Sequence, residues 1–535
     1  MAYYKDLREY IQALEDDTQV VRVKRQINKD TELMPLVRLQ YRGLPEGKRR
    51  AFIFENLIDA KGREYHTPVA VSVLAGSDRI YSIGMKCQPE EVAEKLAQAA
   101  LHAYEPKLVD NGPVQEEVHM GVTLMERGCL EEFPIPNSTP GYDPSPAITA
   151  GFWVTKDPES GIRNVATYRA LIKSPTRTGL DFSQSTRGIA IHWNKCREKG
   201  IPLPAAIVIG GPPSIGYVAV SDYPIDTDEL TVAGGIAGEP LEVVKCKTMD
   251  LEVPAHAEIV IEGEINTQEL EPEGAFGESI GIMSMTQPRP FFTVKAITHR
   301  HNPIWLAFIS QFPPNESSKI RYYGNCSAIY KYLKYDLGTE KVLTVTLHEM
   351  ANSYLLLVVQ VKNTSTEEVW RILEAVASFK LSRTSKIIIA VDDDINPYDL
   401  EMVIFALGQR FQPHRDAHII TQRAEGLIDC SLAPMEILER LREEKNLQRP
   451  DRSQLLIDAT MNWPYPPVSL PAKEFMERAL QVGKEEGLPE LELREPVWGR
   501  NLGYWSREDE QKAEWAIKGE HYKTGEIQAK KRRPA

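Results

Sequence analysis

The segment "EIVIEGEINTQELEPEGAFGESIG", residues 258–281, joins two kinds of sequence. In its first half, apolar and acidic residues alternate, which is typical of a half-buried β-strand. Its second half is a glycine-rich turn with three carboxylates. The segment therefore predicts a strand that leads directly into an acidic turn. The alternating residues are Ile259, Ile261 and Ile265 against Glu258, Glu262 and Glu264, and the acids of the turn are Glu271, Glu273 and Glu278.

The rest of residues 116–325 has a similar character. Strand-like runs such as "AITAGFWVTKDPESG", "PAAIVIGGPPS" and "PFFTVKAITHR" are separated by Pro, Gly and Asp clusters. Many short strands at such spacing favour an antiparallel barrel or sandwich. We therefore expect this central part to be built mainly from β-strands.

The flanking parts mix helices and strands. In "MAYYKDLREYIQALEDD", Leu7, Ile11 and Leu14 share one face of an amphipathic helix, and residues 68–76 and 89–104 predict a strand and a helix. After residue 330, "YLLLVVQV", "STEEVWRILEAVASF", "KIIIAV" and "PYDLEMVIFALGQRF" give a βαβα order, which predicts a parallel sheet. The basic end "HYKTGEIQAKKRRPA" predicts an exposed, solvated tail.

These patterns predict an α+β protein with several domains, because a chain of 535 residues is too long for one ordinary core. We expect an N-terminal α/β domain, a strand-rich central domain, a C-terminal α/β domain and a C-terminal extension. Their expected bounds are 1–115, 116–325, 326–480 and 481–535.

Composition narrows the class of protein. With 42% hydrophobic and 26% charged residues, the chain is typical of soluble globular proteins. A net charge of −13 argues against binding to nucleic acid or to anionic membranes, both of which favour basic surfaces. Six scattered cysteines without a CxxC pair suit a reducing compartment, and the charged N-terminus is unlike a signal peptide. We expect a cytoplasmic protein.

The acidic turn is the first candidate for chemistry. Paired carboxylates can divide acid and base work when their surroundings separate their pKa values, and a glycine-rich backbone can approach a ligand closely. Read by itself, the turn can equally be a hydrophilic loop on the surface.

The segment "RNVATYRALI", residues 163–172, is the second candidate. Arg163 and Arg169 lie among apolar residues, where a guanidinium binds a carboxylate or a phosphate. A structural ion pair is the simpler interpretation of these arginines. Asn164 can be a helix cap, a turn residue or an oxygen ligand of a metal.

Other motifs carry less weight. The "VIGGPPSIGYVAVS" turn can expose backbone N–H groups to a phosphate or be a plain tight turn. The aspartates of "VDDDINP", residues 391–397, cap the following helix or hold Mg²⁺. GxGxxG, GxxxxGK[ST] and HExxH motifs do not occur, which disfavours nucleotide-binding and zincin functions.

In their order and spacing, several motifs resemble the UbiD family of reversible decarboxylases over residues 5–480. They are "NVATYR", "TRGIAIHWNK", "PAAIVIGGPP", "GGIAGEPLEVVKCKTMDLEVPAHAEIVIEGEI", "EPEGAFGESIG" and "KIIIAVDDDINPYDL". The resemblance implies a central split β-barrel related to flavin reductases and a C-terminal α/β domain for oligomerisation. It also implies prenylated FMN, which reacts as an azomethine ylide, as the cofactor.

The family's catalytic trio of Glu, Arg and Glu corresponds to Glu273, Arg169 and Glu278. The resemblance implies that Glu273 holds Arg169, which orients the substrate carboxylate. It implies that Glu278 protonates the carbon after CO₂ leaves, and removes that proton in the reverse direction. Glu271 matches no family position and is expected at the surface.

The resemblance also implies a divalent ion, usually Mn²⁺, and K⁺ beside the flavin phosphate. The family's metal-ligand positions match Asn164 and Glu239, and Lys386 matches a phosphate-binding lysine. The family's third ligand, a histidine, would fall near Gly188, where "STRG" has none. Either His192, four residues on, or a water molecule completes the ligand set, or the charge of Arg187 replaces that of the metal altogether. The expected cofactor-binding residues are Asn164, Thr167, Tyr168, Arg169, Arg187, Gly188 and Lys386.

The resemblance implies a decarboxylase, or a carboxylase when CO₂ is abundant, for an aromatic, heteroaromatic or α,β-unsaturated acid, with an aryl-carboxyl CoA thioester as a special case. The expected partners are a flavin prenyltransferase that supplies the cofactor and further copies of the chain, in a dimer or hexamer. A flavin-dependent oxidoreductase and a non-catalytic subunit that binds prenylated FMN are the alternatives.

Overall fold

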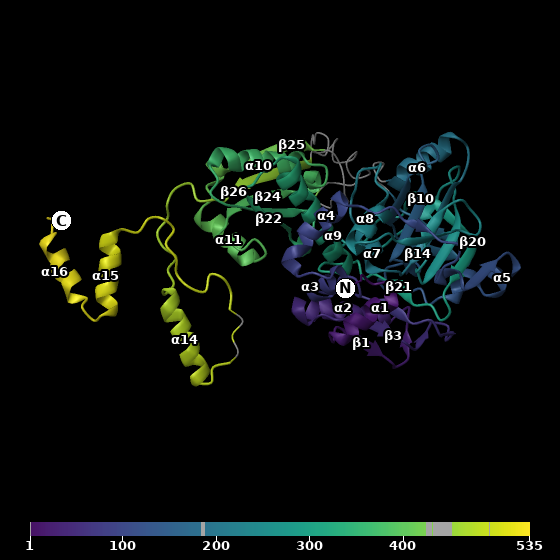
Figure 1. Cartoon of the computed structure of the whole chain (residues 1–535), viewed down its shortest axis with the longest axis horizontal. Helices are drawn as coiled ribbons and strands as arrows, with labels where there is room; N and C mark the ends of the chain where they lie inside the picture. Colours follow the sequence, from purple (N-terminus) through teal and green to yellow (C-terminus); the bar gives the residue numbers. More distant parts are fainter. Residues whose placement is uncertain are drawn as a thin grey trace, which may run out of the picture.

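The computed structural model describes residues 2–182, 188–423, 431, 452–489, 491 and 493–534. It contains a four-stranded N-terminal sheet, a nine-stranded central sheet and a five-stranded C-terminal sheet, with small two- and three-stranded sheets beside them. Figure 1 shows these parts along the long axis of the molecule. The fold is thus a mixed α+β fold with several sheets, as predicted.

The N-terminal sheet has the order β1-β3-β6-β21, and its last strand comes from far along the chain. The amphipathic helix predicted at the N-terminus is α1, which buries Leu7, Ile11 and Leu14. The division at residue 115 remains a prediction, since β21 lies beyond it. The elements are α1 (Leu7–Asp16), β1 (Val20–Val23), α2 (Leu33–Gly43), β3 (Ala51–Phe54), β6 (Val69–Val71), α3 (Asp78–Met85), α4 (Val92–Leu101) and β21 (Trp305–Ala307).

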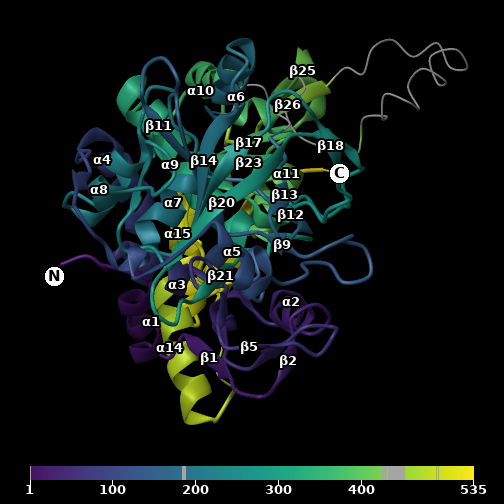
Figure 2. The ribbon, with the colours of Figure 1, turned by 90° about the vertical axis from the view of Figure 1, so that its right-hand side faces the viewer.

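The central sheet is antiparallel, as its many short strands predicted, and forms an open half-barrel. Its order is β11-β10-β14-β17-β20-β13-β12-β9, and β8 also pairs with β20. In Figure 2 the long strands β14, β17 and β20 run side by side. A relation to flavin reductases remains a prediction. The strands are β8 (Glu117–Met120), β9 (Ala147–Ile148), β10 (Gly151–Lys156), β11 (Arg163–Thr167), β12 (Ala170–Ser174), β13 (Arg177–Gly179), β14 (Leu203–Ile209), β17 (Ile259–Ile265) and β20 (Phe291–His299).

Strand β17 departs from the half-buried pattern that its sequence predicted. Glu258 and Glu262, expected on the solvent face, have no exposed surface. Glu258 binds the guanidinium of Arg8 at 2.9 Å, and Glu262 accepts hydrogen bonds from the backbone N–H groups that follow β15 (Glu242–Lys245). Loops and helices therefore cover both faces of this strand, and its carboxylates serve as internal acceptors.

Three helices pack against the half-barrel and position its loops. They are α6 (Gly188–Glu198), α7 (Pro213–Val220) and α8 (Glu229–Ala237). The acidic turn lies between two short paired strands, β18 (Glu271–Glu273) and β19 (Gln287–Arg289). The smaller sheets contain β2 (Ile27–Asn28), β4 (Leu57–Ile58) and β5 (Glu64–Tyr65), and β7 (Lys107–Leu108), β15 and β16 (Glu252–Pro254).

The C-terminal sheet has the order β22-β23-β24-β26-β25, with helices α10 (Thr366–Ser378) and α11 (Leu400–Gln409). Its three inner strands are parallel, as the βαβα order predicted, and the two outer strands are antiparallel. Helix α9 (Glu316–Lys331) leads into this domain. The strands are β22 (Val342–Leu347), β23 (Leu356–Val361), β24 (Ile387–Asp392), β25 (Ala417–Arg423) and β26 (Arg452–Asp458).

The aspartates after β24 do not cap α11. The side chain of Asp399 caps this helix by accepting from the backbone N–H of Glu401, while Asp392 and Asp394 bind the buried guanidinium of Arg410 at 3.2 and 2.5 Å. An arginine thus supplies the charge that the alternative interpretation assigned to Mg²⁺.

The C-terminal extension is helical, and its basic end is mostly exposed, as predicted. Helices α14 (Lys473–Glu485), α15 (Arg507–Ile517) and α16 (Tyr522–Lys530) lie away from the body of the molecule in Figure 1. None of the described helices has the length and apolar character needed to cross a bilayer.

Candidate active site

Arg169 lies in the two-residue link between β11 and β12, and the acidic turn lies beside it. Its Nη1 donates to Oε1 of Glu278 at 2.6 Å, and its Nη2 contacts Oδ2 of Asp181 at 3.0 Å. The link itself is fixed because the indole Nε1 of Trp153 donates to the carbonyl of Tyr168 at 2.9 Å. The structure therefore brings Arg169 and Glu278 together, as the sequence predicted.

Glu273 is buried in the same turn but does not form the expected pair with Arg169. Its side chain has no exposed surface, and neither carboxylate oxygen accepts a hydrogen bond from the described residues. The nearest cation is Lys173 on β12, whose Nζ lies 3.6 Å from Oε2. The carboxylate that holds the second Nη of Arg169 is instead Asp181, which also accepts from Nε of Arg289 at 2.8 Å.

Burial shifts both carboxyl groups of the turn in the same direction. It raises the pKa of Glu278 above its usual range, and the neighbouring Arg169 only partly opposes this shift. Burial also raises the pKa of Glu273, against the opposing charges of Lys173 and Arg169. The pKa values of both groups therefore lie closer to neutral pH than that of an exposed glutamate, which suits general acid–base catalysis.

Side chains inside the turn and near it keep it in place. The ring of Phe276 lies 4.9 Å from the guanidinium carbon of Arg169, which is a cation–π contact. Asp143 accepts a hydrogen bond from the backbone N–H of Gly277 at 3.2 Å. Glu271, expected at the surface, is half-buried and binds Nζ of Lys173 at 3.1 Å.

Asn164 on β11 is a buried amide beside the start of α6. Its Nδ2 has no hydrogen-bond acceptor within the described part of the chain. A Cβ atom at Gly188 would lie 1.8 Å from Oδ1 of Asn164, so only glycine allows α6 to approach the amide this closely. The structure thus brings Asn164 and Gly188 together, and it leaves one buried polar atom of the amide unsatisfied.

A buried carboxylate next to Asn164 is supplied by Glu229 and not by Glu239. Oε2 of Glu229 accepts from the backbone N–H of Val165 at 2.7 Å, and burial raises the pKa of Glu229 to about 8. Glu239 is exposed and lies at the opposite end of α8, beyond its C-terminus. The predicted metal ligand Glu239 is therefore at a solvated position, and Glu229 has the burial and location that such a ligand needs.

His192 packs one helical turn beyond Gly188 on α6. Its Nδ1 bonds the hydroxyl of Thr155 at 3.0 Å, and burial lowers its pKa to about 4. Thr155 and Asn164 are paired residues of β10 and β11, so His192 faces the same side of the sheet as Asn164. Its hydrogen bond to Thr155 supports the structural interpretation of His192 over that of a metal ligand.

The other predicted cofactor residues are spread more widely. Thr167 ends β11, and its buried Oγ1 has no partner among the residues described. Lys386 lies immediately before β24 in the C-terminal domain, where its Nζ donates to the hydroxyl of Ser431 at 2.6 Å. Arg187, and the segment 183–187 that lacks the expected histidine, lie outside the described residues.

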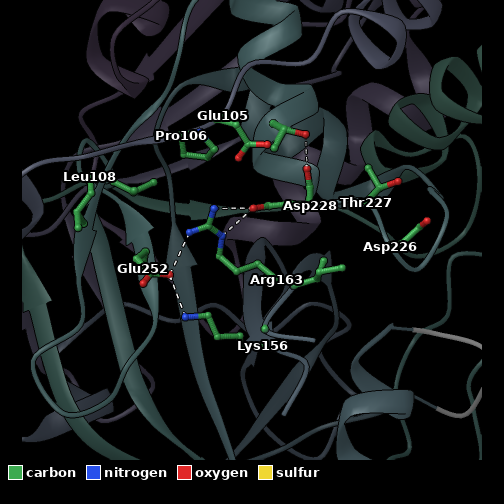
Figure 3. Close-up of a pocket in the computed structure, with 13 residues that line it drawn as sticks. Glu105, Pro106, Leu108, Lys156, Arg163, Asp226, Thr227, Asp228 and Glu252 are labelled. Carbon is green, nitrogen blue, oxygen red and sulfur yellow. Dashed lines mark hydrogen bonds and ion pairs between the residues drawn. The ribbon is translucent and has the colours of Figure 1, made fainter. Parts of the chain in front are cut away.

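Arg163 has the structural role that was the simpler interpretation. Its guanidinium binds Asp228 at 2.6 Å and Glu252 at 3.0 Å (Figure 3). These side chains line a polar cavity of about 680 Å³ between β11 and the residues before α8. Asp228 is also the N-cap of α8, so this ion pair places the adjacent Glu229 against β11.

Reasoning from sequence missed Glu229, Asp181 and Lys173. A signal for Glu229 was present in "DELTVAGGIA", where two acids precede an almost wholly apolar helix and one of them suffices as the cap. Asp181 and Lys173 gave no such signal, because only the pairing of β12 with β13 brings them to the turn.

Comparison with known proteins identifies the family of this chain. A family model described as the 3-octaprenyl-4-hydroxybenzoate carboxy-lyase Rift-related domain matches residues 106–313, and the C-terminal domain model of the same carboxy-lyase matches residues 325–459. An uncharacterised protein of Aquifex aeolicus is 31% identical over 514 residues, which cover 90% of this chain and 97% of the relative.

Two solved structures are similar over nearly their whole length. An evolved dimeric form of the UbiD-class enzyme HmfF from Pelotomaculum thermopropionicum, in complex with prFMN, has a TM-score of 0.73 at 28% identity, and the match covers 88% of this chain and 97% of that one. Vanillic acid decarboxylase of Sedimentibacter hydroxybenzoicus, in its open form, has a TM-score of 0.73 at 25% identity, with 90% and 100% covered. The chain therefore belongs to the UbiD family of carboxy-lyases.

Proposed function

We propose that this protein is a non-oxidative, reversible decarboxylase of an aromatic, heteroaromatic or α,β-unsaturated carboxylic acid, with prenylated FMN as its cofactor. The observation that carries the proposal is the contact between Arg169 and the half-buried Glu278, at 2.6 Å. A carboxylate-binding cation thus lies beside a carboxyl group whose pKa is raised by partial burial.

The residues around Asn164 fit a metal-bound flavin phosphate. The unsatisfied Nδ2 of Asn164 can donate to a phosphate oxygen, while its Oδ1 and the carboxylate of Glu229 are ligands that Mn²⁺ accepts. Gly188 leaves room for close approach, and K⁺ would share the phosphate charge. When bound, prenylated FMN supplies an azomethine ylide that activates a conjugated carboxylic acid.

Side chains of the protein itself bind the substrate acid and transfer the proton. The Nε of Arg169 is buried without a partner among the described residues, so the guanidinium retains a donor for the substrate carboxylate. Asp181 fixes the plane of this guanidinium at 3.0 Å. When the substrate carboxylate binds Arg169, Glu278 loses its counter-charge. Its pKa then rises further, so Glu278 is protonated and can donate this proton to the carbon that CO₂ leaves.

The proposal includes partners. A flavin prenyltransferase would supply the cofactor, and copies of the chain would assemble as a dimer or hexamer. The substrate must be conjugated next to its carboxylate; an aryl-carboxyl CoA thioester is a special case of this class.

The test is the substitution Glu278→Gln in protein co-produced with a flavin prenyltransferase and purified without oxygen. Loss of the general acid should lower the rate of CO₂ release by roughly 10²–10⁴-fold. Bound prenylated flavin, measured by mass spectrometry after denaturation, should remain near one per chain. Glu264→Gln, on the exposed side of β17, is the matched control and should retain wild-type turnover.

Other outcomes would favour the alternative functions. Plain FMN alone, with active prenyltransferase present, would indicate a flavin oxidoreductase. Full occupancy with prenylated flavin, but no CO₂ release or exchange with any conjugated acid, would indicate a non-catalytic binding subunit. Unchanged turnover in Glu278→Gln would contradict the assigned acid.

A further inference from the structure

We propose that His119, Glu132 and His299 form a second divalent-metal site, suited to Zn²⁺ and separate from the candidate active site. One ligand atom of each side chain lies within 4.8 Å of the other two. The residues come from β8, from the short helix Cys129–Glu132 and from the last position of β20. No part of the decarboxylation scheme uses them.

The strongest indication is the unsatisfied nitrogen of His299. Its Nδ1 lies 2.8 Å from the carbonyl oxygen of Arg300, and because a carbonyl can only accept, Nδ1 carries the proton. In the neutral imidazole the other ring nitrogen, Nε2, then has a bare lone pair. The residue is only 7% exposed, and Nε2 finds no hydrogen-bond donor in the part of the chain that is described.

This arrangement is that of a metal-binding histidine. In such residues one ring nitrogen donates to a carbonyl or carboxylate, which directs the other nitrogen to the ion. A buried acceptor without a donor is destabilising, and a bound cation would remove this cost. Nε2 of His299 is directed toward Oε1 of Glu132, at 3.9 Å, a distance too long for a hydrogen bond.

The spacing of the three groups suits a small cation between them. The Nδ1 of His119 lies 3.1 Å from Oε2 of Glu132, and its ring packs edge-on against His299 with 4.9 Å between centroids. Ligand atoms about 2.0–2.2 Å from a tetrahedral Zn²⁺ lie roughly 3.3–3.6 Å apart. The two contacts of Glu132, 3.1 Å from Oε2 to His119 and 3.9 Å from Oε1 to His299, fall on either side of that range, so a rotation of the carboxylate would bring one oxygen near both histidines.

The elements that carry the ligands give the site a structural role. His119 and His299 lie on paired strands, with His119 opposite Ile297 and His299 opposite Glu117. Glu132 belongs to the loop that continues into the buried Phe133, which packs against Trp305 of the N-terminal sheet. An ion would therefore fasten this loop to the edge of the half-barrel. The side chain of Glu132 is 20% exposed, which leaves room for a water molecule as the fourth ligand.

The site is distinct from the proposed flavin metal. The other end of β20 pairs Phe291 with Gly179, beside the acidic turn. Eight residues separate Phe291 from His299, which is roughly 26 Å along an antiparallel strand. Asn164 lies on β11, which β10, β14 and β17 separate from β20 in the sheet, so two different ions can be assigned, one at Asn164 and Glu229 and one at His299.

The test counts Zn²⁺ per chain by equilibrium dialysis of chelator-treated full-length protein, followed by elemental analysis. The background variant Glu229→Gln removes the proposed flavin-site ligand, so any remaining stoichiometric Zn²⁺ reports on the second site. We expect about one Zn²⁺ per chain in Glu229→Gln, and its loss when Glu132→Gln or His299→Asn is added. His301→Asn, an exposed histidine two residues from His299, is the matched control and should retain the ion.

A second readout guards against misfolding of the variants. Co²⁺ added to the Glu229→Gln protein, with His119, Glu132 and His299 intact, should give the visible absorption of a tetrahedral nitrogen–oxygen site, and Zn²⁺ should displace it. Less than a tenth of an ion per chain in this intact protein would overturn the proposal. So would Zn²⁺ binding that persists in the folded double variant Glu229→Gln, Glu132→Gln. Neither result bears on decarboxylation, so the two proposals can fail separately.

Discussion

Glu273 and Glu278 lie five residues apart in one turn, yet their neighbours give them different roles. Glu278 contacts the guanidinium of Arg169, which a substrate carboxylate can also bind. Glu273 instead lies 3.6 Å from Lys173 and accepts no hydrogen bond from the described residues. In the proposed reaction, Glu278 is therefore the group whose protonation state depends on the substrate, whereas Glu273 is a buried neighbour whose pKa is also raised by burial.

This difference predicts the pH dependence of the reaction. Burial raises the pKa of Glu278, and the donor form is protonated. The kcat for decarboxylation should therefore be highest below this raised pKa and fall as the pH rises through it. Exchange of the carbon-bound proton of the decarboxylated product, which needs ionised Glu278 as a base, should show the opposite trend. Steady-state CO₂ release and deuterium exchange across pH 5–9 measure both. A kcat that rises with pH would contradict the assignment.

Glu229 predicts a pH effect on stability. Its pKa is about 8 in the folded chain, against an ordinary value of 4.5, so the folded state binds more protons between these values. Stability of the metal-free protein should thus decrease as the pH rises from 5 to 8, by at most about 4 kcal/mol from this group. The Glu229→Gln variant has no charge to bury at this position, so its stability should decrease less over the same pH range.

Thermal unfolding with chelator present measures this effect. The Tm of Glu229→Gln should exceed that of the wild type at pH 8 and approach it at pH 5. Mn²⁺ should raise the Tm of the wild type and leave Glu229→Gln unaffected. Glu239→Gln is the exposed control and should follow the wild type; equal Tm values for all three proteins at pH 8 would refute the burial argument.

At the scale of elements, the β12–β13 hairpin and the acidic turn fit together with no spare room. A Cβ atom at Gly179 would lie 1.6 Å from Oε2 of Glu273. Gly179→Ala should therefore displace the carboxylate and lower turnover by tenfold or more, while overpacking costs about 1–3 kcal/mol of stability. Kinetics and thermal unfolding check this.

The matched control is Gly408→Ala, where a methyl group in α11 meets open space. Glycine in a helix interior is less stable than alanine by about 1 kcal/mol, so this variant should be fully active and slightly more stable. If Gly179→Ala were equally active, the position of Glu273 would not matter to the reaction.

Sequence periodicity predicted the helices and strands more reliably than it predicted which of their side chains are buried and what those side chains contact. The strand β17, the helix α10 with Ser365 as its cap and the parallel centre of the C-terminal sheet all follow from local patterns. The burial of Glu258 and Glu262 does not, because their partners lie in segments that only the folded chain brings near. The motifs indicated that Arg169, Glu273 and Glu278 share one site, but they paired Arg169 with Glu273; its contacts with Glu278 and Asp181, and the place of Glu229, required the structure.

At the scale of the whole molecule, Glu316 ties its parts together. This first residue of α9 is fully buried, and its carboxylate accepts from the backbone N–H groups of Ser72 and Leu74, both at 2.9 Å. Helix α9 continues toward the C-terminal sheet and packs on β22. One side chain therefore connects the N-terminal sheet to the helix that carries the C-terminal domain.

Removing this side chain should weaken the whole assembly. Glu316→Ala leaves buried N–H groups unpaired and should lower the free energy of unfolding by about 3–5 kcal/mol. Glu316→Gln retains an acceptor and should cost less. Glu367→Ala, in the exposed first turn of α10, is the control; Tm and sensitivity to limited proteolysis measure all three, and a Tm for Glu316→Ala equal to that of Glu367→Ala would contradict the prediction.

Strand β21 has a consequence for how the protein is made. It pairs in parallel with β6, yet more than 230 residues of chain separate the two strands. A ribosome that has released only the first hundred or so residues has therefore exposed a three-stranded sheet without its neighbouring strand, and the N-terminal sheet can be completed only after the half-barrel has been synthesised. The two parts must mature as one unit during translation, so a gene fragment ending near residue 115 should yield a product that depends on chaperones.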